Sequence, residues 1–122
     1  MVRRRGPRVS YVEHSVLGML RRLKVRFRHR TYVAGHEVDF LLPRPGRKGL
    51  IIEVDGDLYH FDQERRERRD QILQGAGWEV LHFWGSEVQQ TPNLVFERLE
   101  TELEGVPRIS KKQTSQRAIR SD

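Results

Sequence analysis

The sequence contains no cysteine and no apolar run close to the roughly 20 residues that cross a bilayer. The missing cysteine excludes a disulfide framework, a thiolate zinc site and a cysteine nucleophile. No apolar signal core follows the basic N-terminal residues, so we expect a cytoplasmic protein with no membrane partner. A length of 122 residues suits a single domain with one modest core.

The formal net charge of +6 is unevenly distributed. Residues 1–8 carry +4, residues 106–122 carry +4, and residues 9–105 carry −2, with 14 basic and 16 acidic residues. We therefore expect a basic N-terminal arm over 1–9, a folded domain over 10–105 and a basic disordered tail over 106–122. Such arms contact a polyanion or serve only solubility, and charge does not decide between these. The candidate DNA contacts in them are Arg3, Arg4, Arg5, Lys111 and Lys112.

Hydrophobic spacing predicts an α/β fold in the order α-β-β-β-α-β-α. Three consecutive strands suggest an antiparallel meander, and the following helix is long enough to place the fourth strand parallel to the third. The expected fold is a small α/β sandwich around a mixed four-stranded sheet, with a turn-rich basic loop over 43–47. The expected helices cover about 10–24, 62–76 and the segment from 92, and the expected strands cover 25–33, 37–42, 49–55 and 79–84.

Carboxylates gather near the end of the third predicted strand. Glu53 and Asp55 are two residues apart, so they project from the same face of a strand. Their charges repel each other and resist burial, and a divalent cation such as Mg²⁺ would resolve that repulsion. A strand that ends in an Asp-Gly turn is the alternative. Asp39, between Val38 and Phe40, either lies beside Glu53 or faces solvent on a half-exposed strand.

Two further residues are candidates for the same site. Glu13 falls inside the apolar arc of the first helix, between Leu17 and Leu20, so it either points toward a site across the sheet or caps the helix with Ser10. His60 follows the end of the third strand. It is either a proton carrier near the acids or a packed polar residue.

The second predicted helix has few apolar residues and many arginines. A helical wheel places Arg65, Arg66 and Arg69 near its inward arc. Arginine stems can lie along apolar surface while their heads pair with acids or grip phosphates in a fork geometry. The alternative is a solvated helix held by ion pairs along its own surface.

The ordered set of these motifs resembles a bacterial family of small endonuclease-like domains. That family is related to the very short patch repair endonucleases within the PD-(D/E)XK nuclease superfamily. The resemblance covers about residues 10–104 and implies a restriction-endonuclease-like core that hydrolyses DNA phosphodiester bonds with Mg²⁺ or Mn²⁺. It also implies a nucleoid-associated role in a bacterium, in DNA repair or in defence and mobile-element biology. The motifs are Val38-Asp39-Phe40, Ile51 to Gly56, His60, Arg65 to Asp70, and Gly77 to Trp84.

The resemblance assigns roles to individual residues. It makes Asp39 and Glu53 metal-binding acids and Glu13 a supporting acid. The superfamily usually has lysine two residues after the second acid, where this chain has Asp55. Asp55 is then a further metal ligand with His60 handling the proton, or catalysis is weak or lost. The two main functions in view are a metal-dependent DNA endonuclease, as a homodimer if both strands are cut, and a catalytically weak DNA-binding module on a nuclease fold. A protein-interaction domain with solubilising tails is a third, which the crowding of Glu53 and Asp55 at an apolar strand end opposes.

Overall fold

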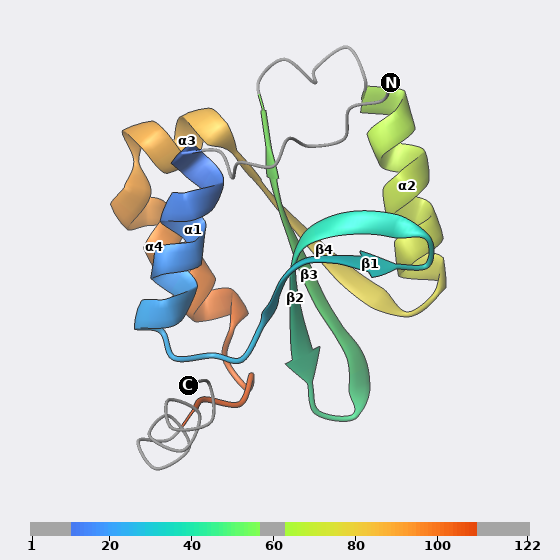
Figure 1. The fold of residues 1–122 in the computed structure, drawn as a ribbon, viewed down its shortest axis with the longest axis horizontal. Coiled ribbons are helices and arrows are strands. Elements are labelled where there is room, and N and C mark those ends of the chain that lie inside the picture. The colour runs from blue at the N-terminus through green and yellow to red at the C-terminus, as the bar shows by residue number, and fades with distance from the viewer. Residues whose placement is uncertain (1–10, 57–62, 110–122) are drawn as a thin grey trace, which may run out of the picture.

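The structure, a computed structural model, describes residues 11–56 and 63–109 (Figure 1). The predicted element order is confirmed, with one short helix, α3, added after the last strand. None of the helices in the described ranges has the length and apolar character that a bilayer crossing needs. The elements are α1 (Tyr11–Arg22), β1 (Arg28–Val33), β2 (His36–Arg44), β3 (Arg47–Asp55), α2 (Gln63–Gly75), β4 (Trp78–Trp84), α3 (Gly85–Gln90) and α4 (Pro92–Glu102).

The strands form one mixed sheet in the order β1-β2-β3-β4. The pairs β1–β2 and β2–β3 are antiparallel, and β3–β4 is parallel, as the long crossover through α2 predicts. The basic loop predicted over 43–47 is shorter than expected, because β2 runs to Arg44 and β3 starts at Arg47. Pro43 lies where the β2–β3 register shifts, since proline has no N–H for a ladder hydrogen bond.

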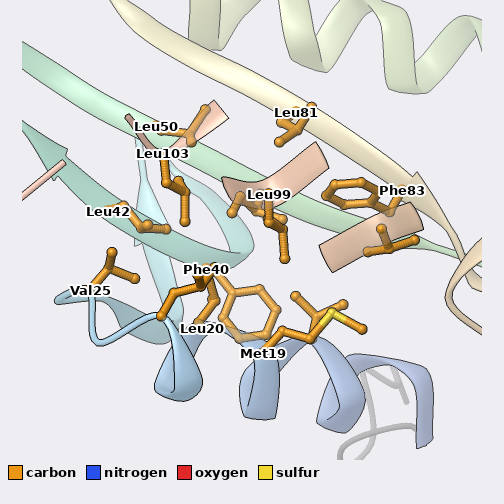
Figure 2. Packing of buried hydrophobic residues seen from close by; sticks show 14 of the residues in the cluster. Met19, Leu20, Val25, Phe40, Leu42, Leu50, Leu81, Phe83, Leu99 and Leu103 are labelled. Atoms are coloured by element: carbon orange, nitrogen blue, oxygen red, sulfur yellow. The ribbon is translucent and has the colours of Figure 1, made fainter. Parts of the chain in front are cut away.

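Helices cover both faces of the sheet: α1, α3 and α4 lie on one face and α2 lies on the other (Figure 1). The larger core fills the space between the sheet and α1 and α4, where Phe40 and Leu20 meet with no exposed surface (Figure 2). A smaller cluster lies on the other face, built from Val33, Val38, Ile51 and Leu73 of α2.

Alternation along β3 assigns each side chain to one of these faces. Leu50 and Ile52 belong to the larger core, and Ile51 belongs to the cluster under α2. By the same alternation Glu53 and Asp55 face α2. One face of β3 therefore contributes apolar side chains to the larger core, and its other face carries Glu53 and Asp55.

Contacts with the domain continue beyond Gly105, where the boundary of the folded part was expected. Val106 is buried in the larger core, and Arg108 pairs with Val25 in an isolated bridge. The backbone N–H of Ile109 donates to the carbonyl of Lys24 at 2.6 Å. The described end of the chain is thus fixed against the segment that joins α1 to β1.

Candidate functional site

Asp39 and Glu53 lie side by side where β2 and β3 separate. Both are buried, with 1% and 4% of their surface exposed. The Val54 N–H donates to Asp39 Oδ2 at 2.8 Å, and the Asp39 N–H donates to Glu53 Oε2 at 3.2 Å. These bonds follow directly after the last ladder pair at Phe40, so the carboxylates take the place of backbone partners. The expected closeness of the two acids is confirmed, and the solvent-facing alternative for Asp39 is wrong.

The electrostatics of Glu53 favour an added cation. Burial and then the charge of Asp39 raise the pKa of Glu53 from 4.5 to about 7, although Arg69 opposes the shift. Arg69 Nη2 donates to Glu53 Oε2 at 2.9 Å and to the Glu37 carbonyl at 2.7 Å. One guanidinium thus serves both the carboxylate and a backbone oxygen. At Glu53, burial and the neighbouring Asp39 charge therefore outweigh the guanidinium of Arg69.

Asp55 belongs to a different network. Its Oδ2 accepts a hydrogen bond from Arg66 Nη1 at 3.2 Å and lies 2.7 Å from His82 Nδ1. The other ring nitrogen of His82 lies 2.6 Å from Asp70 Oδ2. Burial lowers the pKa of His82, but hydrogen bonds and charges from Asp55 and Asp70 outweigh it and raise that pKa from 6.5 to about 9. A doubly protonated imidazole between two carboxylates follows from this geometry.

The predicted ligand set of three acids is not assembled in this arrangement. Within residues 11–56 and 63–109, no three carboxylate or imidazole side chains come close enough together to hold a metal ion. Asp39 and Glu53 still fit a hard cation, because Mg²⁺ is commonly held by one or two carboxylates together with waters and substrate phosphates. Arg66 and His82 already engage Asp55 Oδ2, and a role of Asp55 as a further metal ligand stays a prediction.

Glu13 is buried in α1, as its place in the apolar arc predicted. It accepts hydrogen bonds from Arg30 Nε at 3.1 Å and lies 2.7 Å from His29 Nε2. The His29 ring stacks on Phe40 at 4.9 Å between centroids. Arg30 has a φ of 58°, an uncommon value for a non-glycine residue, and the pairing of β1 with β2 omits it. The capping partner Ser10 lies outside the described residues.

The arginines of α2 divide into two groups. Arg66 and Arg69 reach the acids as predicted, but Arg65 is exposed and does not lie on the inner face. The inner face is centred on Leu73, which is fully buried, whereas Ile72 is 52% exposed. Arg65 is eight residues before Leu73 and so lies about 80° around the helix from it. Arg66 and Arg69 are seven and four residues before Leu73 and share its side.

Two functional candidates were missed in the sequence, His82 and Asp70. Strand alternation could have placed His82 on the face toward α2. Residues 78, 80, 82 and 84 of β4 share one face, and Trp78 and Val80 on that face pack in the cluster under α2. Asp70 lies on α2, and no pattern in the sequence pairs it with His82 of β4. The predicted residues that lie outside the described ranges are His60, Arg3, Arg4, Arg5, Lys111 and Lys112, and their roles stay predictions.

A mixed sheet with paired buried acids at its centre, covered by an arginine-rich helix, defines an α/β domain of the endonuclease-like type. The chain matches the REase_MTES_1575 family over residues 12–103, and it belongs to this restriction endonuclease-like family. A relative in Haemophilus influenzae, described only as "Uncharacterized protein", is 33% identical over 82 residues. That match covers 66% of this chain and 49% of the relative, so the chain spans about half the length of the curated relative it matches.

Proposed function

We propose that the protein is a divalent-metal-dependent DNA endonuclease that hydrolyses phosphodiester bonds, in DNA repair or in defence and mobile-element biology. The observation that carries the proposal is the buried pair of Asp39 and Glu53, in which burial and like charge raise the pKa of Glu53 to about 7. A divalent cation between two buried carboxylates would offset their repulsion, and carboxylates are ligands that Mg²⁺ accepts. Membership of a restriction endonuclease-like family supports nuclease activity.

In this proposal Asp39 and Glu53 hold Mg²⁺ or Mn²⁺. When bound, the ion lowers the pKa of a coordinated water and stabilises charge on the phosphoryl oxygens. Arg69 lies 2.9 Å from Glu53, so a phosphate that reaches the acids also meets a guanidinium suited to grip it. His60 is the candidate proton carrier by resemblance.

The remaining charged groups act as positioning residues in the proposal. Glu13 holds His29 and Arg30 beside the strand that carries Asp39. Asp55 anchors Arg66, whose guanidinium also lies 5.0 Å from the centre of the Trp84 ring. This contact keeps Arg66 at the edge of the site, where a phosphate can approach it.

A catalytically weak DNA-binding module is the second candidate, and a specific observation favours it. Asp55 stands where the superfamily usually has lysine, and its carboxylate is already neutralised by Arg66 and His82. No lysine at this position is available to orient the attacking water.

A plasmid-nicking assay tests the proposal, with Mg²⁺, with Mn²⁺ and with a chelator, on single- and double-stranded DNA. We expect cleavage with metal and none with chelator. Glu53→Gln should abolish cleavage, while the matched variant Glu100→Gln, at an exposed position of α4, should retain it. Failure to cut either substrate with either metal would exclude the endonuclease, and a retained gel shift would then support the binding module.

A further inference from the structure

A basic segment runs from the middle of α1 to the end of β1. Residues 14–36 contain six Lys and Arg residues and no Asp or Glu. Residues 9–105 together carry a net charge of −2, so the net charge of the domain does not reveal this basic segment. Its basic residues are Arg21, Arg22, Lys24, Arg26, Arg28 and Arg30.

Most of these cations are available to a ligand. Arg30 pairs with Glu13, and Arg22 lies 4.4 Å from the centre of the Phe96 ring. The other four are exposed and have no carboxylate partner in the part of the chain that the structure describes. Exposed cations without acidic partners raise the local concentration of a polyanion.

A pocket opens within this segment, between the C-terminal half of α1 and the start of β1. Its volume of about 420 Å³ lies in the range of ligand pockets. Leu17, Val25, Phe27 and Ile109 form an apolar lining, and Arg21 and Lys24 add two cations to it. The pocket therefore combines apolar surface with positive charge.

The walls of this pocket are fixed by contacts from distant parts of the chain. Arg108 Nη1 donates to the Leu23 carbonyl at 2.7 Å, and the Ile109 N–H donates to the Lys24 carbonyl at 2.6 Å. Phe27 packs edge-to-face on Phe40 with 5.9 Å between ring centroids. A pocket held in this way is preorganised for a ligand, which lowers the cost of binding.

We propose that the pocket binds one unstacked nucleotide of a DNA strand, with its base against Phe27 and Leu17 and its phosphates on Arg21 and Lys24. A bare anion would leave the apolar lining unused, and an apolar ligand would remove the charges of Arg21 and Lys24 from water without a counter-charge of its own. A nucleotide joins both chemistries, and stacking on aromatic rings beside a basic groove is how proteins hold single strands.

His29 connects the pocket to Glu13 and to the strand that carries Asp39. His29 lines the pocket, and its Nε2 lies 2.7 Å from Glu13 while its ring stacks on Phe40, the neighbour of Asp39. The inference rests on the proposed function, because it names unpaired or frayed DNA as the favoured part of the substrate.

Fluorescence anisotropy in a chelator tests the pocket without cleavage. The probes are a labelled oligothymidylate of about 12 nucleotides, within the site sizes of single-strand binders, and a blunt duplex of equal length. Phe27→Leu keeps apolar volume against Phe40 but removes the flat ring. We expect it to weaken single-strand binding about fivefold or more and to change duplex binding less than about twofold, because duplex bases stay stacked. Phe27→Tyr should retain single-strand binding.

Arg21→Gln tests the phosphate contact. It should weaken single-strand binding and lower the slope of log affinity against log salt by about 0.7, the value for one lost phosphate contact. The matched control Arg98→Gln removes an exposed arginine of α4 that lies 4.8 Å from the Phe83 ring, outside the pocket, and should change neither. Thermal unfolding of each variant checks that the fold is intact.

Three outcomes would overturn the pocket. These are unchanged single-strand affinity in Phe27→Leu, equal losses on both probes, or NMR contacts from residues 110–122 to Phe27 that persist when the oligothymidylate is added. Plasmid cleavage in Mg²⁺ is read separately. If the protein cleaves plasmid but Phe27→Leu leaves single-strand affinity unchanged, the pocket is wrong and the endonuclease stands. If Phe27→Leu weakens single-strand binding but the protein does not cleave, the endonuclease is wrong and the pocket stands.

Discussion

The two faces of the sheet use opposite kinds of side chain. The face toward α1 and α4 is filled with fully buried apolar groups such as Phe40 and Leu42 (Figure 2). The face toward α2 has a small apolar cluster and then an array of ion pairs around Glu53 and Asp55. One strand, β3, supplies both faces by alternation.

This difference separates the side chains that stabilise the fold from the charged side chains of the proposed site. Apolar burial stabilises the fold at roughly 25 cal/mol per Å² of buried apolar surface. Buried ion pairs contribute little net stability, because the cost of removing charges from water offsets their attraction. Net stability therefore does not account for gathering so many charged groups on the face toward α2, and the predictions below test this division.

Phe40→Ala should have the largest effect on stability. The side chain is fully buried and contacts both Phe27 and His29, so its removal leaves a cavity in the larger core. We expect a loss of about 3–5 kcal/mol in the free energy of unfolding, measured by urea denaturation. Leu94→Ala, at a position that is 60% exposed, is the control and should change it by less than about 0.5 kcal/mol. A loss below about 1.5 kcal/mol for Phe40→Ala, outside the range for such truncations, would contradict the assignment of the core.

Glu53→Gln should act in the opposite direction on stability. The pKa of Glu53 rises from 4.5 in the unfolded chain to about 7 in the fold, so the folded state binds the proton more tightly. Stability of the native protein then falls as the pH rises from 4.5 to 7, and Gln removes this fall. We expect the variant to match the native protein near pH 4, below the pKa of the unfolded chain, and to exceed it by about 1–3 kcal/mol at pH 8. Denaturation at both pH values measures the difference, and a less stable variant at pH 8 would contradict the burial penalty.

His82→Asn should destabilise the protein in a pH-dependent way. The pKa of His82 is raised from 6.5 to about 9, so its contribution is fully present below 6.5 and is lost as the pH rises through 9. We expect a loss of about 1–2 kcal/mol at pH 6, discounted for a side chain with partial exposure, and little loss near pH 10. His36→Asn, a partly exposed histidine of β2, is the control. Equal losses at both pH values would show that packing, not charge, is what His82 contributes.

Local patterns in the sequence predicted much of this architecture. The shared face of Glu53 and Asp55, the closeness of Asp39, and the parallel fourth strand all follow from alternation and crossover length, which are properties of neighbouring residues. The helix α3 was missed because it is short and Val88 is its one buried large apolar residue. Its start is marked by the Trp84 N–H, which donates to Glu87 Oε1 at 2.9 Å.

The partners of the acids could not be predicted in the same way. His82 meets Asp55 and Asp70 only because β4 pairs with β3 in one register and α2 crosses above both. Arg66 and Arg69 face inward, and Arg65 does not, because Leu73 rather than Ile72 is buried. The rotation of a helix with so few apolar residues is set by the sheet beneath it.

Arg68→Ala should have the smallest effect and completes the comparison on α2 itself. Arg68 Nη1 lies 4.0 Å from Glu64 Oε1, with side chains that are 67% and 91% exposed. Water screens this pair, so we expect a loss below about 0.5 kcal/mol, and less at high salt. Arg69→Ala on the inner side of the same helix removes the partner of buried Glu53 and should cost more at neutral pH, because it leaves that carboxylate without its guanidinium. Urea denaturation of both variants at low and high salt measures the contrast, and equal losses would mean that the inner and outer ion pairs of α2 are equally solvated.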